Sequence, residues 1–187
     1  MSYQFKNITV LVVESNHAMF DLTKAVLVTF GVNQVYSAYG FEQGYDSFCQ
    51  LGPDLVIVDW LEDPQNGLEL ARKIRNHKGS PNPFVPIILM TGYSQKTRVL
   101  RARDAGVTEF LVKPFTAKTL YQRIEQLVER PRAFVRCESY FGPDRRRKRE
   151  ADYAGPERRV TQKKPGKLTA AQKARELLNR RSIEEET

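Results

Sequence analysis

Short apolar runs alternate with longer amphipathic stretches along the first 130 residues of the chain. Apolar runs that predict strands occupy residues 8–13, 35–38, 54–58, 86–90 and 109–112. The third run, Leu55 to Val58, is fully apolar and leads directly into Asp59. A continuous run of this kind is typical of a strand covered on both faces of a parallel sheet.

Between these runs, apolar residues recur at the spacing of an α-helix. The predicted helices occupy residues 17–30, 41–51, 68–74, 94–105 and 116–129. Five repeats of strand then helix predict an α/β fold with a doubly wound, five-stranded parallel sheet. By analogy we expect the flavodoxin-like strand order 2-1-3-4-5, which is common among such sheets.

In this order the carboxyl ends of the first, third, fourth and fifth strands meet around one crevice. The residues at those ends are Glu14, Ser15, Asp59, Thr91 and Lys113. Carboxylates can bind Mg²⁺ through oxygen, and a carboxylate can also act as a nucleophile toward phosphorus. A lysine and a hydroxyl can stabilise the transferred phosphoryl group. The set indicates a site for a phosphoryl group and a divalent cation.

Five short motifs resemble the receiver domain of two-component response regulators, over about residues 6–130. They are Val12-Val13-Glu14, Val58-Asp59-Trp60, Gly67-Leu68-Glu69-Leu70, Met90-Thr91-Gly92 and Val112-Lys113-Pro114-Phe115. The resemblance implies that Asp59 accepts a phosphoryl group from a phosphohistidine. It also implies that Thr91 hydrogen-bonds this group, that Lys113 pairs with it, and that the peptide bond before Pro114 is cis.

The resemblance further assigns Mg²⁺ ligands and a switch residue. The implied metal ligands are Glu14, Asp59 and the backbone carbonyl of Leu61. Phe110 lies where the family has a rotating aromatic residue, often Tyr. Because Phe lacks the hydroxyl, switching through it would depend on packing alone.

The sequence departs from the family after the first strand. Typical receivers have two adjacent acidic residues there, and this chain has Glu14 followed by Ser15. A hydroxyl is a poorer Mg²⁺ ligand than a carboxylate, so we expect weaker metal binding and slower phosphotransfer. Glu62 or Asp63, in the loop after Asp59, could restore the missing charge.

The last third of the chain differs in composition, and we divide the chain into a receiver, 1–130, and a basic extension, 131–187. The first part has 14 Lys and Arg against 13 Asp and Glu, whereas the second has 16 against 9. Few apolar residues predict a largely irregular extension. We expect Phe134 and Val135 to anchor its start and a short helix to span about 169–182.

A seven-residue sequence occurs twice in the extension. Tyr140-Phe141-Gly142-Pro143-Asp144-Arg145-Arg146 recurs as Tyr153-Ala154-Gly155-Pro156-Glu157-Arg158-Arg159. Paired arginines can bind phosphates or carboxylates, so Arg145, Arg146, Arg158 and Arg159 are candidate anion-binding residues. Three alternatives stay open: a solvated tail, a docking arm for an acidic protein surface or the receiver itself, and a nucleic-acid-binding segment, which is the least favoured.

The sequence therefore predicts a non-enzymatic signalling protein whose only chemistry is phosphorylation and dephosphorylation of Asp59. Its expected partners are a histidine kinase or phosphotransfer protein and a downstream protein target, and pairing as a homodimer is compatible with the family. The alternative is an atypical receiver that acts as an interaction module without phosphorylation.

No apolar run has the length of a membrane span, and two scattered cysteines favour the cytoplasm.

Overall fold

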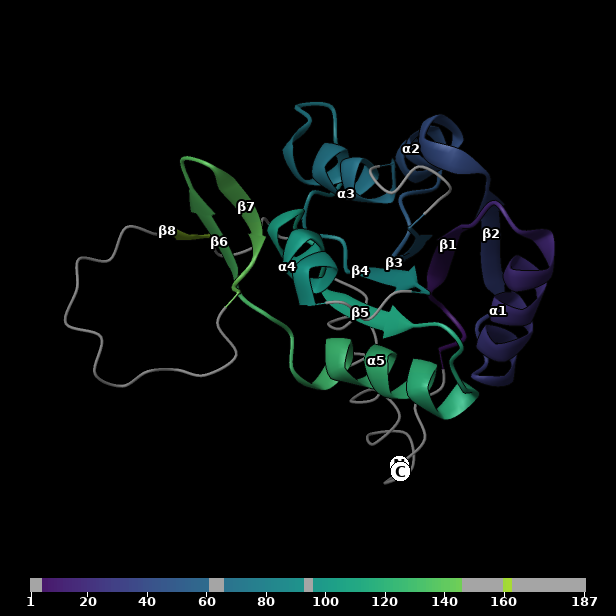
Figure 1. Ribbon diagram of the computed structural model, residues 1–187. Coiled ribbons are helices and arrows are strands. Elements are labelled where there is room, and N and C mark those ends of the chain that lie inside the picture. The colour runs from purple at the N-terminus through teal and green to yellow at the C-terminus, as the bar shows by residue number, and fades with distance from the viewer. Residues whose placement is uncertain (1–4, 61–65, 93–95, 146–159, 163–187) are drawn as a thin grey trace, which may run out of the picture.

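The computed structural model of the chain describes residues 5–60, 66–92, 96–145 and 160–162. Five parallel strands form a sheet in the order β2-β1-β3-β4-β5, which confirms the predicted doubly wound fold (Figure 1). The strands of this sheet are β1 (Thr9–Val13), β2 (Gln34–Ala38), β3 (Leu55–Asp59), β4 (Ile87–Thr91) and β5 (Glu109–Val112). The helices are α1 (His17–Thr29), α2 (Gly40–Leu51), α3 (Asn66–Asn76), α4 (Lys96–Asp104) and α5 (Ala117–Glu129).

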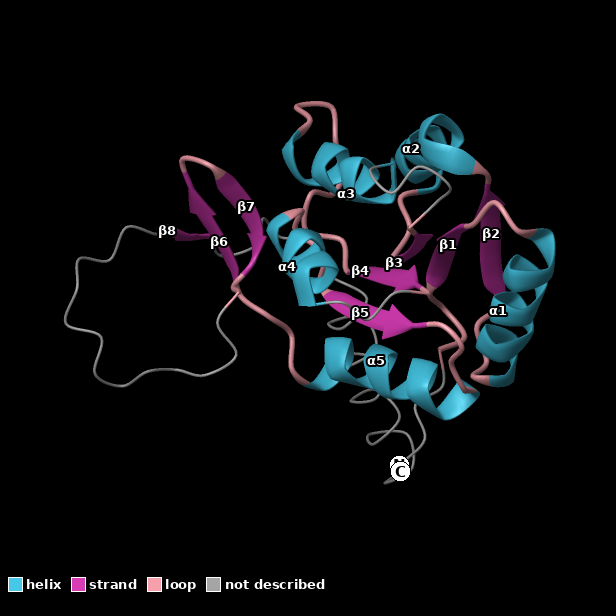
Figure 2. Ribbon diagram, viewed as in Figure 1, coloured by secondary structure: helices cyan, strands magenta, loops and turns pink. Residues whose placement is uncertain are grey.

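Two apolar cores lie on opposite faces of this sheet, with α2, α3 and α4 on one face and α1 and α5 on the other (Figure 2). Successive side chains of a strand point to opposite faces, so each central strand supplies both cores. In β3, Val56 and Val58 join the first core, whereas Leu55 and Ile57 join the second. This explains why the strand is apolar at every position before Asp59.

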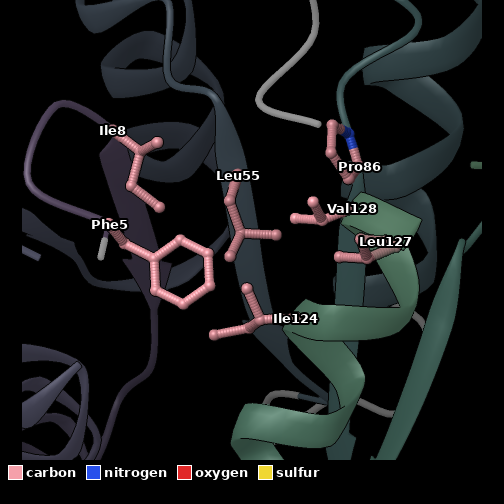
Figure 3. A pocket seen from close by; sticks show the side chains of 7 residues that line it. All are labelled: Phe5, Ile8, Leu55, Pro86, Ile124, Leu127 and Val128. Carbon is pink, nitrogen blue, oxygen red and sulfur yellow. The ribbon is translucent and has the colours of Figure 1, made fainter. Parts of the chain in front are cut away.

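A small apolar pocket remains under α5, at the end of the sheet opposite the predicted site (Figure 3). Its lining is entirely apolar: Phe5, Ile8, Leu55, Pro86, Ile124, Leu127 and Val128. Its volume of about 10 Å³ is near the minimum for one water molecule. The pocket is therefore a packing feature of the second core.

None of the helices in the described part of the chain combines the length and the apolar character that crossing a bilayer requires.

The extension begins with an ordered β-structure that the sequence analysis did not predict. The strands β6 (Phe134–Cys137) and β7 (Tyr140–Pro143) form an antiparallel hairpin, and β8 (Val160–Gln162) pairs with the other edge of β6. The expectation of a largely irregular extension therefore does not hold for the described residues 131–145. The predicted helix at 169–182 lies outside the described residues.

The hairpin is attached to the receiver by an aromatic cluster. Phe134 and Phe141 pack on Phe84, with ring centroids 5.1 and 5.3 Å from it. Both predicted anchors, Phe134 and Val135, are buried, and the contact with Phe84 confirms the prediction for Phe134. Gly142 faces the turn after α4, since a β-carbon on it would lie 3.0 Å from the α-carbon of Gly106.

Arg75, at the end of α3, lies buried beneath this hairpin. Its guanidinium donates to the carbonyl oxygens of Gly106 and Pro83, each at 2.9 Å, and to the hydroxyl of Thr108 at 3.3 Å. It also lies over the Phe134 ring, 5.1 Å from the centroid. Burial lowers the pKa of Arg75 to about 9, so the group is still charged at neutral pH. A buried guanidinium is costly unless its hydrogen bonds are satisfied. The hairpin covers these hydrogen bonds.

Candidate functional site

The sheet register brings the predicted site residues to one edge. Asp59 is the last residue of β3 and pairs with Met90, next to Thr91 at the end of β4. The amide of Lys113 donates to the carbonyl of Thr91 at 2.7 Å, which fixes the chain just beyond β5. The amide of Glu14 donates to Ala38 at 3.1 Å, directly after β1. Each residue is thus positioned by the hydrogen bonds of a parallel strand.

Lys113 connects the two carboxylates of the site. Its ammonium nitrogen lies 2.7 Å from Oε2 of Glu14 and 2.8 Å from Oδ1 of Asp59. The Glu14 side chain is almost fully buried, whereas those of Asp59 and Lys113 are each 18% exposed. Asp59 can therefore be reached from solvent while Glu14 forms the floor of the site.

Burial alone would lower the pKa of Lys113. The hydrogen bonds that Lys113 donates to Asp59 and Glu14, together with the attraction of both carboxylates, outweigh this effect, so the pKa of Lys113 lies above its ordinary value. Lys113 is consequently a cation at neutral pH. The second oxygen of Glu14 accepts a hydrogen bond from the amide of Asn16 at 3.0 Å, which holds the carboxylate in place.

Gly67 and Trp60 shape the backbone next to Asp59, and the sequence analysis gave neither a role in the site. A β-carbon on Gly67 would lie 2.4 Å from the carbonyl oxygen of Asp59, closer than real side chains approach backbone atoms. The Trp60 side chain is buried, with the guanidinium of Arg98 5.3 Å from its ring centroid. Gly67 does occur in the motifs above, but only coordinates reveal this close approach.

The carboxylates fit Mg²⁺ in part. Mg²⁺ is commonly bound by one or two carboxylates and several waters, and Glu14 and Asp59 can supply these two. Within the described residues, no group of three or more His, Cys, Asp or Glu side chains could hold a metal ion. Ser15, which replaces the second acidic residue, is exposed. Leu61, Glu62 and Asp63 lie outside the described residues.

The remaining predicted residues lie in different surroundings. The Thr91 side chain is fully buried, and Phe110 is half-buried against the first core. Arg145 forms an ion pair with Asp104 at 2.7 Å and lies over the ring of Tyr140, 4.4 Å from its centroid. Arg145 therefore contacts the receiver itself, which is compatible with the prediction that the extension is a docking arm. Arg146, Arg158 and Arg159 lie outside the described residues.

The chain is similar in sequence to known proteins. The chain is 28% identical to chemotaxis protein CheY-3 of Vibrio cholerae over 128 residues, which cover 67% of this chain and 95% of that protein. It is 33% identical to a chemotaxis protein CheY homolog of Campylobacter jejuni over 122 residues, covering 63% of this chain and 90% of that protein. These matches leave about a third of this chain uncovered.

Solved structures show the same fold. Chemotaxis response regulator CheY4 of Vibrio cholerae superimposes with a TM-score of 0.58 at 22% identity, covering 64% of this chain and 98% of that one. The signal receiver domain of a DNA binding response regulator from Colwellia psychrerythraea also gives 0.58, at 24% identity, with 66% of this chain and all of that one covered. The sequence profile of the response regulator receiver domain matches residues 10–125. The chain therefore belongs to the response regulator receiver domain family.

Proposed function

We propose that Asp59 accepts a phosphoryl group from a histidine kinase or phosphotransfer protein and that the phosphorylated receiver signals through protein contacts. The observation that carries this proposal is the position of Lys113, whose ammonium lies within 2.8 Å of both Glu14 and Asp59. One partly exposed carboxylate beside a fixed cation suits a nucleophile whose single negative charge is replaced by the negative charge of a phosphoryl group.

In the proposed reaction, a carboxylate oxygen of Asp59 attacks the phosphorus of a phosphohistidine on the partner. A P–O bond forms, the P–N bond breaks, and the imidazole nitrogen leaves with the electron pair. Lys113 then pairs with a phosphoryl oxygen and Thr91 donates a hydrogen bond to another. Glu14, Asp59, the Leu61 carbonyl and Glu62 are the proposed ligands of Mg²⁺, which would neutralise charge on the phosphoryl group.

A small-molecule phosphodonor with Mg²⁺ tests the proposal. The wild-type chain should take up one phosphoryl group, seen as a slower band on a phosphate-affinity gel, and Asp59→Asn should not. Asp46→Asn, which alters an exposed aspartate on α2, is the matched control and should behave as the wild type. Equal labelling of the wild type and Asp59→Asn would refute the assignment of Asp59.

The second candidate is a receiver that binds its partners without phosphorylation. Exposed Ser15 in place of a carboxylate favours it, because the site has one negative charge fewer to hold Mg²⁺. In that case the phosphodonor would not label the wild type, and a Ser15→Asp variant, which regains the carboxylate, would be labelled. We propose the cytoplasm as the location for either activity, supported by the two free cysteines, Cys49 and Cys137.

A further inference from the structure

The strand β2 forms one edge of the parallel sheet, and β5 forms the other (Figure 1). Among the described residues, β2 pairs only with β1, so its outer side has no neighbouring strand. A strand edge of this kind presents backbone amides and carbonyls that can pair with another chain. Proteins commonly block such edges with charged residues, with proline or with an irregular backbone.

The two edges of the sheet differ in how they are blocked. The strand β5 carries Glu109 and leads into Lys113 and Pro114. By contrast, β2 has the sequence Gln-Val-Tyr-Ser-Ala, which contains no charged residue, no proline and no glycine. No Asp, Glu, Lys or Arg occurs between residues 25 and 41, although these four types make up 28% of the chain. The β2 edge therefore lacks the usual protection against pairing.

The hydrogen bonds to β1 show which backbone groups of β2 face outward. The amide of Glu14 donates to the carbonyl of Ala38, so Ala38 directs its carbonyl toward β1. Alternate residues of a parallel strand direct their backbone groups to opposite sides. Tyr36 therefore pairs inward with β1, whereas Val35 and Ser37 present their amides and carbonyls at the outer edge. These are two donors and two acceptors.

This arrangement of donors and acceptors is complementary to itself. If two copies of β2 lie antiparallel with Tyr36 at the centre, Val35 of each copy lies opposite Ser37 of the other. Each such pair exchanges two hydrogen bonds. The two Tyr36 side chains then occupy a non-hydrogen-bonded position, where side chains across an antiparallel pair are closest. The Tyr36 side chain is 42% exposed in the single chain, and this contact would cover it.

The charge around β2 also favours contact between two copies. The chain carries a net charge of +8, so two copies repel each other at long range. The helix α1 packs beside β2 (Figure 2) and exposes Leu22 and Val28. Its only Asp, Glu, Lys or Arg residues are Asp21 and Lys24, whose charges cancel. The surface formed by α1 and β2 is therefore neutral and partly apolar, which allows two like-charged chains to approach.

We propose that two copies of the chain associate through antiparallel pairing of their β2 strands, which joins their sheets into one continuous sheet. Each copy offers this edge once, so a two-fold axis closes the assembly as a dimer. Because the paired strands run in opposite directions, the two Asp59 sites lie at opposite ends of the joined sheet. The inference goes beyond the proposed function, since the pairing needs neither Mg²⁺ nor phosphorylation.

Sedimentation equilibrium of the full chain over a range of concentrations tests the proposal. We expect a monomer–dimer equilibrium with a dissociation constant of roughly 1–100 μM, because the pairing forms few hydrogen bonds and covers few side chains. Asp59→Asn without Mg²⁺ should dimerise as the wild type does. A chain that remains monomeric at about 1 mM, or that grows into species larger than a dimer, would overturn the proposal.

Point variants distinguish the β2 edge from other surfaces. Tyr36→Lys places two like charges opposite each other and should raise the dissociation constant about tenfold or more. Ser37→Pro removes an outward donor and no hydrogen bond to β1, so it should act similarly. Leu100→Lys, which changes an exposed side chain on α4, is the matched control and should dimerise as the wild type. Unchanged association of Tyr36→Lys, or loss of the dimer in Leu100→Lys alone, would contradict the assignment to β2.

Cysteine cross-linking tests the register of the pair. In a chain with Cys49→Ser and Cys137→Ser, Tyr36→Cys should form a disulfide-linked dimer on mild oxidation, since directly opposite β-carbons lie about 4.5–5.5 Å apart. Ser37→Cys is the control, because the two residues at position 37 lie diagonally across the pair, roughly 7–8 Å apart. Cross-linking at position 37 that equals or exceeds that at position 36, or none at either position, would overturn the antiparallel pairing.

Discussion

The ammonium of Lys113 lies 2.7 Å from a carboxylate oxygen of Glu14, although 99 residues separate them in the sequence. Glu14 is buried, so this contact supplies the positive charge that a buried carboxylate needs. The same ammonium reaches Asp59 at 2.8 Å. One side chain therefore pairs with both carboxylates of the site and links the ends of three strands.

Replacing Lys113 with Met should leave two like charges facing each other without a cation. We expect the free energy of unfolding to fall by about 2 kcal/mol, less than for a fully buried pair because the site is partly open to water. In the double variant with Glu14→Gln, the loss should be smaller than the sum of the two single losses. Chemical denaturation of all four proteins measures this coupling, and strict additivity would mean that the pair contributes nothing.

Ser15→Asp should restore the second acidic residue after β1. Because an added carboxylate is a better Mg²⁺ ligand than a hydroxyl, we expect Mg²⁺ to bind about tenfold more tightly. Fluorescence of the buried Trp60, next to Asp59, provides the titration signal. Equal Mg²⁺ affinity of the wild type and Ser15→Asp would contradict the prediction that Ser15 weakens metal binding.

The Glu62→Gln, Asp63→Asn double variant tests whether the loop after Asp59 compensates for Ser15. In the same assay, an unchanged Mg²⁺ affinity of this variant would show that the loop supplies no compensating charge.

Gly67→Ala should displace the backbone that carries Asp59. Its new β-carbon would lie 2.4 Å from the Asp59 carbonyl oxygen, so the strand end has to move. We expect a loss of about 2 kcal/mol in stability and slower labelling by the phosphodonor.

Gly92→Ala is the matched control for this variant. Gly92 directly follows a site residue, Thr91, and a β-carbon there meets no atom within 4 Å among the described residues. Its stability and labelling rate should be close to those of the wild type. If the two alanine variants behave alike, the close approach at Gly67 is not a constraint on the site.

Phe141→Ala tests whether the hairpin belongs to the folded receiver. It removes the ring that packs on Phe84, and it introduces the residue that the second repeat carries as Ala154. We expect a loss of about 3 kcal/mol, which thermal or chemical unfolding measures. Tyr36→Ala, which truncates a 42% exposed ring on β2, is the control and should cost far less. Similar losses in both variants would mean that the extension adds no stability.

Most of the receiver could be predicted from the sequence, because the local pattern of apolar residues determines its strands and helices. The first, third, fourth and fifth apolar runs lead into polar residues, and the strand order expected by analogy placed Glu14, Asp59 and Lys113 at one sheet edge. The coordinates bring these three side chains together. The direct contact between Lys113 and Glu14 was not predicted, since sequence spacing does not show which carboxylate a lysine reaches.

The hairpin shows where such reasoning fails. Its strands are four residues long and contain a Gly-Pro pair, which the pattern indicates as a turn. The hairpin packs on Phe84 and on the buried Arg75, which lie far away in the sequence. Long-range contacts of this kind override local propensity, and composition alone made the extension look irregular.

The most direct test of the account is chemical identification of the phosphorylated residue. After treatment with a phosphodonor and Mg²⁺, borohydride reduces an aspartyl phosphate to homoserine, which peptide mass spectrometry can locate. The account predicts homoserine at position 59 in the wild type and none in Asp59→Asn. Homoserine at a different aspartate, or phosphate uptake with position 59 unchanged, would contradict it.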